Sequence, residues 1–133
     1  MTRILELMKI KKPPYVIAIV DDDQMVLESL GNLLESAGYS VRLFACAEAF
    51  LRGDTLNEID ALISDIRMPG IDGIELQLQV GVTRPDLPVI LVTARNDHDP
   101  TRTRQPNNRA VFCKPIDAAE LVKTVATVVK ENP

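Results

Sequence analysis

The sequence predicts an α/β fold in which a doubly wound, five-stranded parallel sheet carries helices on both faces. Short apolar runs alternate along the chain with segments whose apolar residues recur at helical spacing. Several of these runs are continuous, as in strands buried on both faces of a parallel sheet. Strands and helices that alternate in this way are joined by right-handed crossovers.

The predicted elements follow from where the apolar pattern changes. Val26, Leu30 and Leu34 recur at helical spacing, and Gly38 follows where a left-handed C-terminal cap belongs. Asp117 is placed to cap the last helix. The predicted strands are 15–20, 40–44, 61–65, 87–92 and 110–113, and the predicted helices are 26–37, 45–51, 73–80 and the segment after Asp117.

The third strand ends on Asp65, and the chain must bend directly after it. Pro69 and Gly70 interrupt both strand and helix, and Asp72-Gly73 begins a new turn. A charged side chain at the carboxyl end of a buried strand is well placed for chemistry. Taken alone, this stretch supports two interpretations about equally well: Asp65 is a functional residue, or it merely ends a strand in solvent.

Composition bounds the class of protein. The 133 residues suit one domain, and 46% hydrophobic and 26% charged residues are typical of a soluble globular protein. A net charge of -4 argues against direct nucleic-acid binding, and the chain lacks a membrane-spanning run and a signal-peptide layout, so we expect a cytoplasmic protein with no membrane contact. Cys46 and Cys113 lack metal-ligand spacing and are expected to be reduced packing residues.

Residues 1–14 are predicted to be a flexible N-terminal extension ahead of a domain at 15–131. Its apolar residues could form one weak helical turn, which the following Lys and Pro residues would end. A docking segment is the alternative to a tail.

Polar residues stand at the carboxyl ends of four predicted strands. Asp21 and Asp22 follow the first strand, and Asp65, Thr93 and Lys114 end three others. Parallel strands bring these ends to one edge of the sheet. Crowded carboxylates repel one another, and Mg²⁺ (or Mn²⁺), which prefers oxygen ligands, would relieve that repulsion.

These residue types fit phosphoryl transfer. Asp65 could act as a nucleophile that forms an acyl phosphate, while Lys114 and Thr93 contact the phosphoryl oxygens. Each residue also has an ordinary explanation, as a helix cap, a strand-end hydroxyl or a surface lysine. Their joint occurrence at four strand ends favours the functional interpretation.

The sequence resembles a response-regulator receiver domain of bacterial two-component signalling, most closely the receivers of two-domain transcriptional regulators. The likeness covers about residues 15–130 and rests on the motifs VDDD, SDIRMPGIDGIEL, LPVILVTAR and CKPID. It implies a CheY-like strand order of 2-1-3-4-5. The resemblance also implies site roles: phosphorylation at Asp65, metal binding by Asp21, Asp22, Asp65 and the Arg67 backbone carbonyl, phosphate contact or switching by Thr93, Ala94 and Lys114, and a cis peptide before Pro115.

The chain departs from this family between Thr93 and Lys114. Pro100 and Pro106 would interrupt the usual fourth helix, at about 3 kcal/mol for each interior proline. We therefore expect that helix to be broken, short or mobile, with weak order across 96–109. The family's switch aromatic is also displaced: Val111 stands at its position and Phe112 follows. His98, in this segment, is expected to be exposed to solvent.

The favoured function is a receiver that takes phosphate from a histidine kinase or phosphotransfer protein and signals by protein contact. The contact would be with a downstream protein or an output domain missing from these residues, and a homodimer stays open. One alternative is a phosphate-independent adaptor, which the altered fourth helix would suit. An aspartyl phosphatase is disfavoured because the position two residues after Asp65, where such enzymes carry a general acid, holds Arg67.

Overall fold

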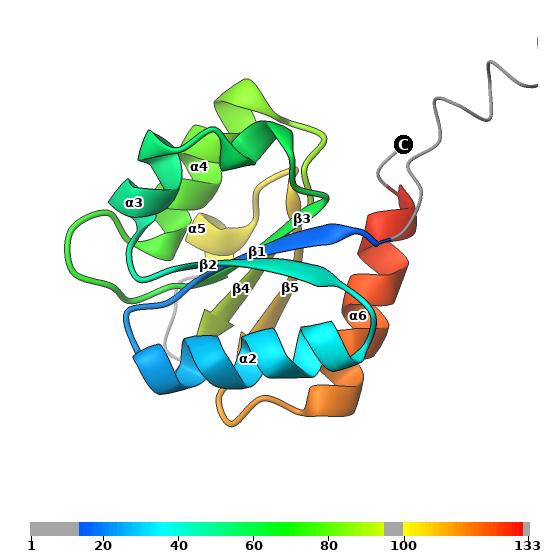
Figure 1. Ribbon diagram of the computed structural model, residues 1–133. Helices are drawn as coiled ribbons and strands as arrows, with labels where there is room; N and C mark the ends of the chain where they lie inside the picture. The colour runs from blue at the N-terminus through cyan, green and yellow to red at the C-terminus, as the bar shows by residue number, and fades with distance from the viewer. Residues whose placement is uncertain (1–13, 95–99, 132–133) are drawn as a thin grey trace, which may run out of the picture.

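Five parallel strands form the centre of the computed structural model, which describes residues 14–94 and 100–131. Their order across the sheet is β2-β1-β3-β4-β5, so the predicted topology is confirmed (Figure 1). The strands are β1 (Val16–Val20), β2 (Ser40–Phe44), β3 (Ala61–Asp65), β4 (Val89–Thr93) and β5 (Asn108–Cys113). The predicted extension at 1–14 lies almost wholly outside the described residues.

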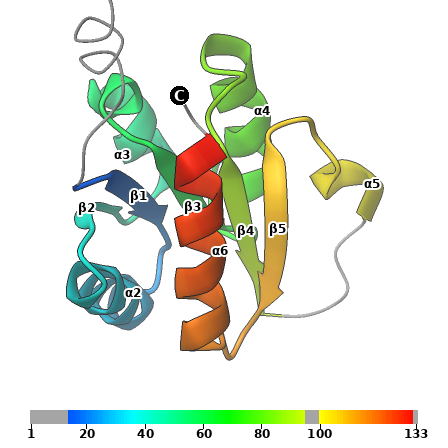
Figure 2. The same ribbon diagram turned by 90° about the vertical axis from the view of Figure 1, so that its right-hand side faces the viewer.

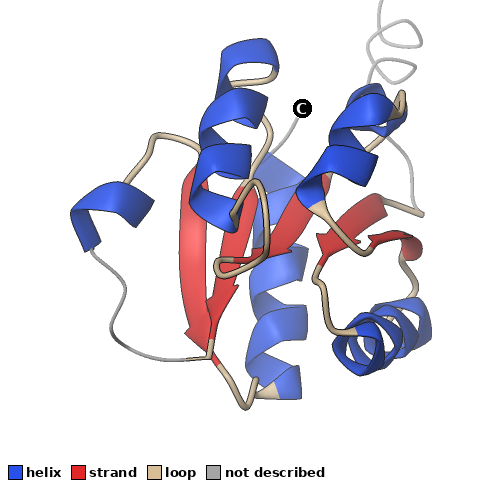
Figure 3. Cartoon of the chain, turned by 90° about the vertical axis from the view of Figure 1, so that its left-hand side faces the viewer, coloured by secondary structure: helices blue, strands red, loops and turns tan. Residues whose placement is uncertain are grey.

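Helices cover both faces of the sheet, as Figure 3 shows. The helices are α2 (Gln24–Ser36), α3 (Ala47–Arg52), α4 (Gly73–Thr83), α5 (Pro100–Thr103) and α6 (Ala118–Glu131), with a 3₁₀ turn at Thr55–Asn57. Helices α2 and α6 pack on one face, and α3 and α4 pack on the other. None of the described helices is both long and apolar enough to cross a lipid bilayer.

Two apolar clusters, one on each face, hold the helices to the sheet. Strand β1 contributes to both, because successive side chains of a strand point to opposite faces: Ala18 and Val20 join the α3/α4 cluster, and Ile17 and Ile19 join the α2/α6 cluster. All residues of β3 and β4 are buried. The continuous apolar runs therefore mark strands covered on both sides, as predicted.

Aspartates and a glycine set the helix ends. The Asp23 carboxylate accepts the Met25 N–H at 2.9 Å at the start of α2, and that of Asp72 accepts the Glu75 N–H at 2.8 Å at the start of α4. Gly38, after α2, has φ of 97°, a left-handed conformation that favours glycine. These capping interactions fix where α2 and α4 begin, beside the strand ends that carry the acidic residues.

The fourth-helix region is shortened, as the prolines predict. Among the described residues, helix α5 comprises the four residues Pro100–Thr103, and it lies beside α4 beyond the β5 edge of the sheet (Figures 2 and 3). Residues 95–99, including His98, lie outside the described part of the chain. The predicted weak order across 96–109 therefore stays a prediction.

Several sequence-based boundaries need correction: β1 begins at Val16 rather than 15, and α2 is Gln24–Ser36 rather than 26–37. Strand β5 begins at Asn108 rather than 110, because Asn107 already pairs with Val89 through its carbonyl and a bulge follows. Strand β4 begins at Val89 rather than 87. Helix α4 continues to Thr83 rather than ending at 80, because the backbone N–H of Arg84 closes its last turn on the Val80 carbonyl. The helix predicted at 45–51 is observed at Ala47–Arg52.

The two cysteines differ in their surroundings. Both are free thiols, as expected, and Cys46 is half-buried. Cys113 is exposed at the end of β5, so the prediction that it is a packing residue is wrong. Alternation puts this side chain on the same face of the sheet as Val111, so its exposure follows from its place at the very end of the edge strand.

Candidate functional site

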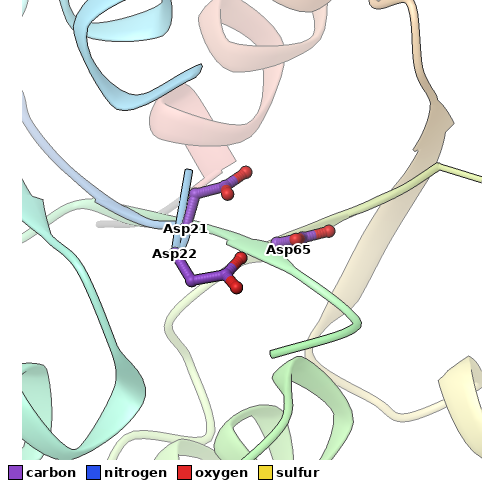
Figure 4. Close-up of side chains that lie close together, drawn as sticks. All are labelled: Asp21, Asp22 and Asp65. Atoms are coloured by element: carbon purple, nitrogen blue, oxygen red, sulfur yellow. The ribbon is translucent and has the colours of Figure 1, made fainter. Parts of the chain in front are cut away.

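The carboxyl edge of the sheet brings the predicted residues together. Asp21 follows β1, Asp65 ends β3, Thr93 ends β4 and Lys114 follows β5. The carboxylates of Asp21, Asp22 and Asp65 converge in Figure 4, and one ligand oxygen from each lies within 4.8 Å of the others. Residues far apart in the sequence thus form one acidic cluster.

The three aspartates meet different environments. Asp21 is 2% exposed: one carboxylate oxygen accepts the Asp23 N–H at 2.8 Å, and the other accepts from Lys114 Nζ at 3.2 Å. Asp65 is 7% exposed, whereas Asp22 is open to solvent. The cluster therefore has a fixed, buried side and a side that an incoming ligand can reach.

Electrostatics at Asp65 reflect this crowding. The pKa of its carboxyl is raised to about 6, first by burial, then by the charge of Asp21 and, less strongly, that of Asp22, against the lowering effects of Lys114 and of the hydrogen bond from the Ile66 backbone. Partial burial lowers the pKa of the Lys114 ammonium, but Asp65 and Asp21 outweigh it, so this pKa is raised overall. The site holds more negative than positive charge and would favour a cation.

Lys114 is tied to the sheet edge at two points. Its backbone N–H donates to the Thr93 carbonyl at 2.7 Å, and its ammonium lies 3.2 Å from Asp21 and 3.7 Å from Asp65. The Lys114–Pro115 peptide is cis, as the family resemblance implied. The chain thus turns away immediately after the lysine while its side chain points to the acidic cluster.

Gly73 brings the start of α4 against the end of β3. Its N–H donates to the Ile66 carbonyl at 2.8 Å, and a Cβ on Gly73 would collide with the backbone oxygen of Asp65. The Ser64 hydroxyl donates to that same oxygen at 3.0 Å. Glycine at position 73 is therefore required by a close backbone approach, which fixes the strand end that carries Asp65.

The acidic cluster fits a divalent cation of the Mg²⁺ type. Such ions take hard oxygen ligands, and one or two carboxylates with waters and phosphate oxygens usually hold them. Asp21, Asp22 and Asp65 supply this donor set, and the pKa of Asp65, raised first by burial and then by the neighbouring carboxylates, shows that the ionised cluster lacks compensating charge. Arg67, whose carbonyl was the predicted fourth protein ligand, is exposed just after Asp65.

The predicted switch residues lie on both faces of the sheet. Thr93 is 1% exposed, while Ala94 beside it is exposed. Val111 packs with the α3/α4 cluster and Phe112 with the α2/α6 cluster. Phe112 therefore points to the opposite face of the sheet from Val111, the position at which the resemblance predicted the switch aromatic.

Two polar residues outside the acidic cluster, Glu48 and Gln77, were not singled out from the sequence. Glu48 accepts a hydrogen bond from the Ile71 N–H at 3.3 Å, in the loop that follows Asp65. Gln77 is fully buried on α4 and bonds to the α5–β5 segment. Neither has a local sequence signal, because both partners lie more than 20 residues away in the chain.

Curated relatives support the assignment. The chain is 34% identical over 120 residues to the response regulator protein TodT of Pseudomonas putida, covering 89% of this chain and 52% of that protein. It is 40% identical over 81 residues to the transcriptional regulatory protein FixJ of Bradyrhizobium diazoefficiens, covering 61% and 40%. The chain thus spans about half the length or less of these relatives.

Structural and family comparisons agree with these relatives. A CheY-like response regulator receiver domain protein from Methanospirillum hungatei superposes with a TM-score of 0.80 at 28% identity, covering 89% of this chain and 95% of that one. The family model for the response regulator receiver domain matches residues 17–126. With this match over most of its length, and with an acidic cluster at the carboxyl edge of its sheet, the chain belongs to the response regulator receiver domain family.

Proposed function

We propose that Asp65 is the phospho-accepting residue of this receiver domain, within a unit spanning 15–131. The observation that carries the proposal is the convergence of a buried Asp65 with Asp21, Asp22 and Lys114 at one sheet edge. Family membership supplies the reaction, and the geometry supports this aspartate because it is the last residue of β3, the middle strand of the sheet, and has Lys114 at 3.7 Å. No finding favours the phosphate-independent adaptor.

The proposed reaction is a single phosphoryl transfer. An oxygen of the ionised Asp65 carboxylate forms a bond to phosphorus as the bond from phosphorus to the donor's leaving group breaks. The leaving group would be an imidazole nitrogen when the donor is a phosphorylated histidine of a kinase or phosphotransfer protein. The product is an acyl phosphate, whose hydrolysis returns the carboxylate.

Residues around Asp65 have separate proposed roles. Asp21, Asp22, Asp65 and the Arg67 carbonyl would hold Mg²⁺ (or Mn²⁺), which when bound supplies positive charge against the phosphoryl oxygens. The Lys114 ammonium would contact the same oxygens, since it already lies between two of the carboxylates. Thr93 and the Ala94 backbone stand at the neighbouring strand end, where a transferred group would meet them.

The output of the domain is proposed by analogy with the relatives. FixJ and TodT are longer regulators, so this receiver would act on an attached output domain or on a separate downstream protein, in the cytoplasm. Val111 at the family's aromatic position and a one-turn α5 indicate that the signal leaves by a route other than an aromatic that moves into the sheet.

A mass measurement tests the proposed reaction. The chain is incubated with a small acyl-phosphate donor, with Mg²⁺ or with excess chelator, and intact mass is followed over time. We expect a gain of one phosphoryl group that needs Mg²⁺, is absent in Asp65→Asn and is unchanged in Asp54→Asn, where the altered aspartate makes no capping hydrogen bond. Equal phosphorylation with chelator, or in Asp65→Asn, would contradict the proposal.

A further inference from the structure

Glu48, in the first turn of α3, packs against the tip of the loop that joins β3 to α4. Its Oε2 accepts the Ile71 N–H at 3.3 Å. The same carboxylate lies against Gly70, whose φ is 76°, and a Cβ on Gly70 would collide with Oε2. The turn at Gly70 therefore needs glycine both for its backbone conformation and for the approach of Glu48.

The contact with Glu48 completes the anchoring of this loop. At its neck, the Gly73 N–H donates to the Ile66 carbonyl at 2.8 Å. In its middle, Met68 is 8% exposed and joins the apolar cluster that includes residues of α3. The backbone of Arg67 lies between neck and tip, so the three anchors together determine where its carbonyl points.

The other oxygen of Glu48 makes this contact a costly one. Among the described residues, Glu48 Oε1 is the one buried side-chain oxygen or nitrogen that lacks a hydrogen-bond partner. Burying a polar atom without a partner costs free energy, and an apolar side chain of similar size would avoid that cost. The hydrogen bond that Glu48 Oε2 accepts from the Ile71 N–H is set against this cost, so the contact points to a role in holding the turn.

We propose that Glu48 is a positioning residue for the phosphorylation site: it holds the Gly70–Ile71 turn so that the backbone at Arg67 keeps the conformation needed to bind the cation. The inference rests on the proposed Mg²⁺ site, and Glu48 itself contacts neither cation nor phosphate. Glu48 would act from α3, an element that contributes no residue to the acidic cluster of Asp21, Asp22 and Asp65.

The test compares Glu48→Leu with Glu48→Gln. Leucine keeps the packing volume but removes the acceptor, while glutamine retains an acceptor for Ile71. Glu58→Leu is the matched control, since Glu58 is exposed on the turn after Thr55–Asn57. Three quantities are measured for each protein: amide hydrogen exchange at Ile71 without metal, the Kd for Mg²⁺ by calorimetry, and the urea unfolding midpoint.

In Glu48→Leu we expect exchange at Ile71 to be faster by roughly 3- to 10-fold, the worth of one ordinary hydrogen bond. The Kd for Mg²⁺ should rise severalfold while the urea midpoint stays equal or increases. Glu48→Gln should restore both exchange and affinity towards the wild-type values, and Glu58→Leu should change neither. Such a separation of affinity from stability is not expected of a residue with a merely structural role.

Two results would overturn the inference. Unchanged Ile71 exchange in Glu48→Leu would show that Glu48 does not hold the turn, and unchanged Mg²⁺ affinity despite faster exchange would show that the turn does not position the site. Failure of the proposed function would look different. The wild-type protein would then bind no Mg²⁺, although amide exchange at Ile71 would still be faster in Glu48→Leu than in the wild type.

Discussion

At the scale of single residues, Asp65 shows how burial and function conflict. The end of a central strand is a rigid place for a nucleophile, but it also removes the carboxylate from water. The result is a pKa of about 6, in place of 3.8 for a free aspartate. The folded protein at neutral pH therefore carries an ionised group that its surroundings disfavour, unless a cation compensates.

The first prediction concerns pH. A carboxyl whose pKa is raised by folding stabilises the folded state only while it holds its proton, so this stabilisation is complete below about pH 4 and is lost as pH rises through about 6. The free energy of unfolding of the wild-type protein should therefore fall relative to Asp65→Asn across that window, by roughly 1 to 3 kcal/mol.

Urea unfolding at several pH values checks this, with Asp54→Asn as the control. Above pH 7, Asp65→Asn should be more stable than the wild type, and added Mg²⁺ should narrow the difference by binding only the wild-type cluster. A difference between the two proteins that does not change with pH would show that Asp65 titrates as an ordinary surface carboxyl.

At the scale of elements, the shortened α5 is secured by polar contacts rather than by an apolar face. Gln77 of α4 is fully buried, donates to the Thr103 carbonyl at 3.3 Å and accepts from the Asn108 amide at 3.0 Å. The Asn107 amide donates to the Gln77 backbone carbonyl at 3.1 Å. A single glutamine thus links α4 to both ends of the segment between α5 and β5.

The second prediction is that Gln77→Ala destabilises the protein by about 2 to 3 kcal/mol, because it removes a fully buried side chain together with its hydrogen bonds to the Thr103 carbonyl and the Asn108 amide. Gln79→Ala is the matched control: Gln79 is exposed and bonds only to Glu75, so its loss should cost no more than about 0.5 kcal/mol. Urea unfolding of both variants measures the difference. Equal effects would mean that the Gln77 contacts contribute little.

The same elements show what could be predicted from the sequence. Pro100 and Pro106 were enough to predict a short fourth helix, since proline acts locally on the backbone. The anchoring role of Gln77 could not be predicted, because its partners lie 26 and 31 residues away and a glutamine on an imperfect apolar face gives no signal of burial. Glu48 escaped notice for the same reason.

At the scale of the whole molecule, the topology of the sheet determines which residues meet at the site. Parallel strands with crossovers place Asp21, Asp65, Thr93 and Lys114 at one edge although they span most of the chain. That convergence was predictable, because strand ends can be located from continuous apolar runs and the parallel arrangement determines which ends meet. The orientation of the Val111 and Phe112 side chains was harder to predict from the sequence, since it depends on the register of β5 and on its bulge.

The most direct test of the account is to identify the atom that receives the phosphoryl group. The chain is phosphorylated with a small acyl-phosphate donor and Mg²⁺, reduced with borohydride so that an aspartyl phosphate becomes homoserine, digested and sequenced by mass spectrometry. We predict homoserine at position 65 and unmodified aspartate at 21 and 22. Homoserine at either of those two positions in the wild-type protein, with an intact Asp65, would contradict the account.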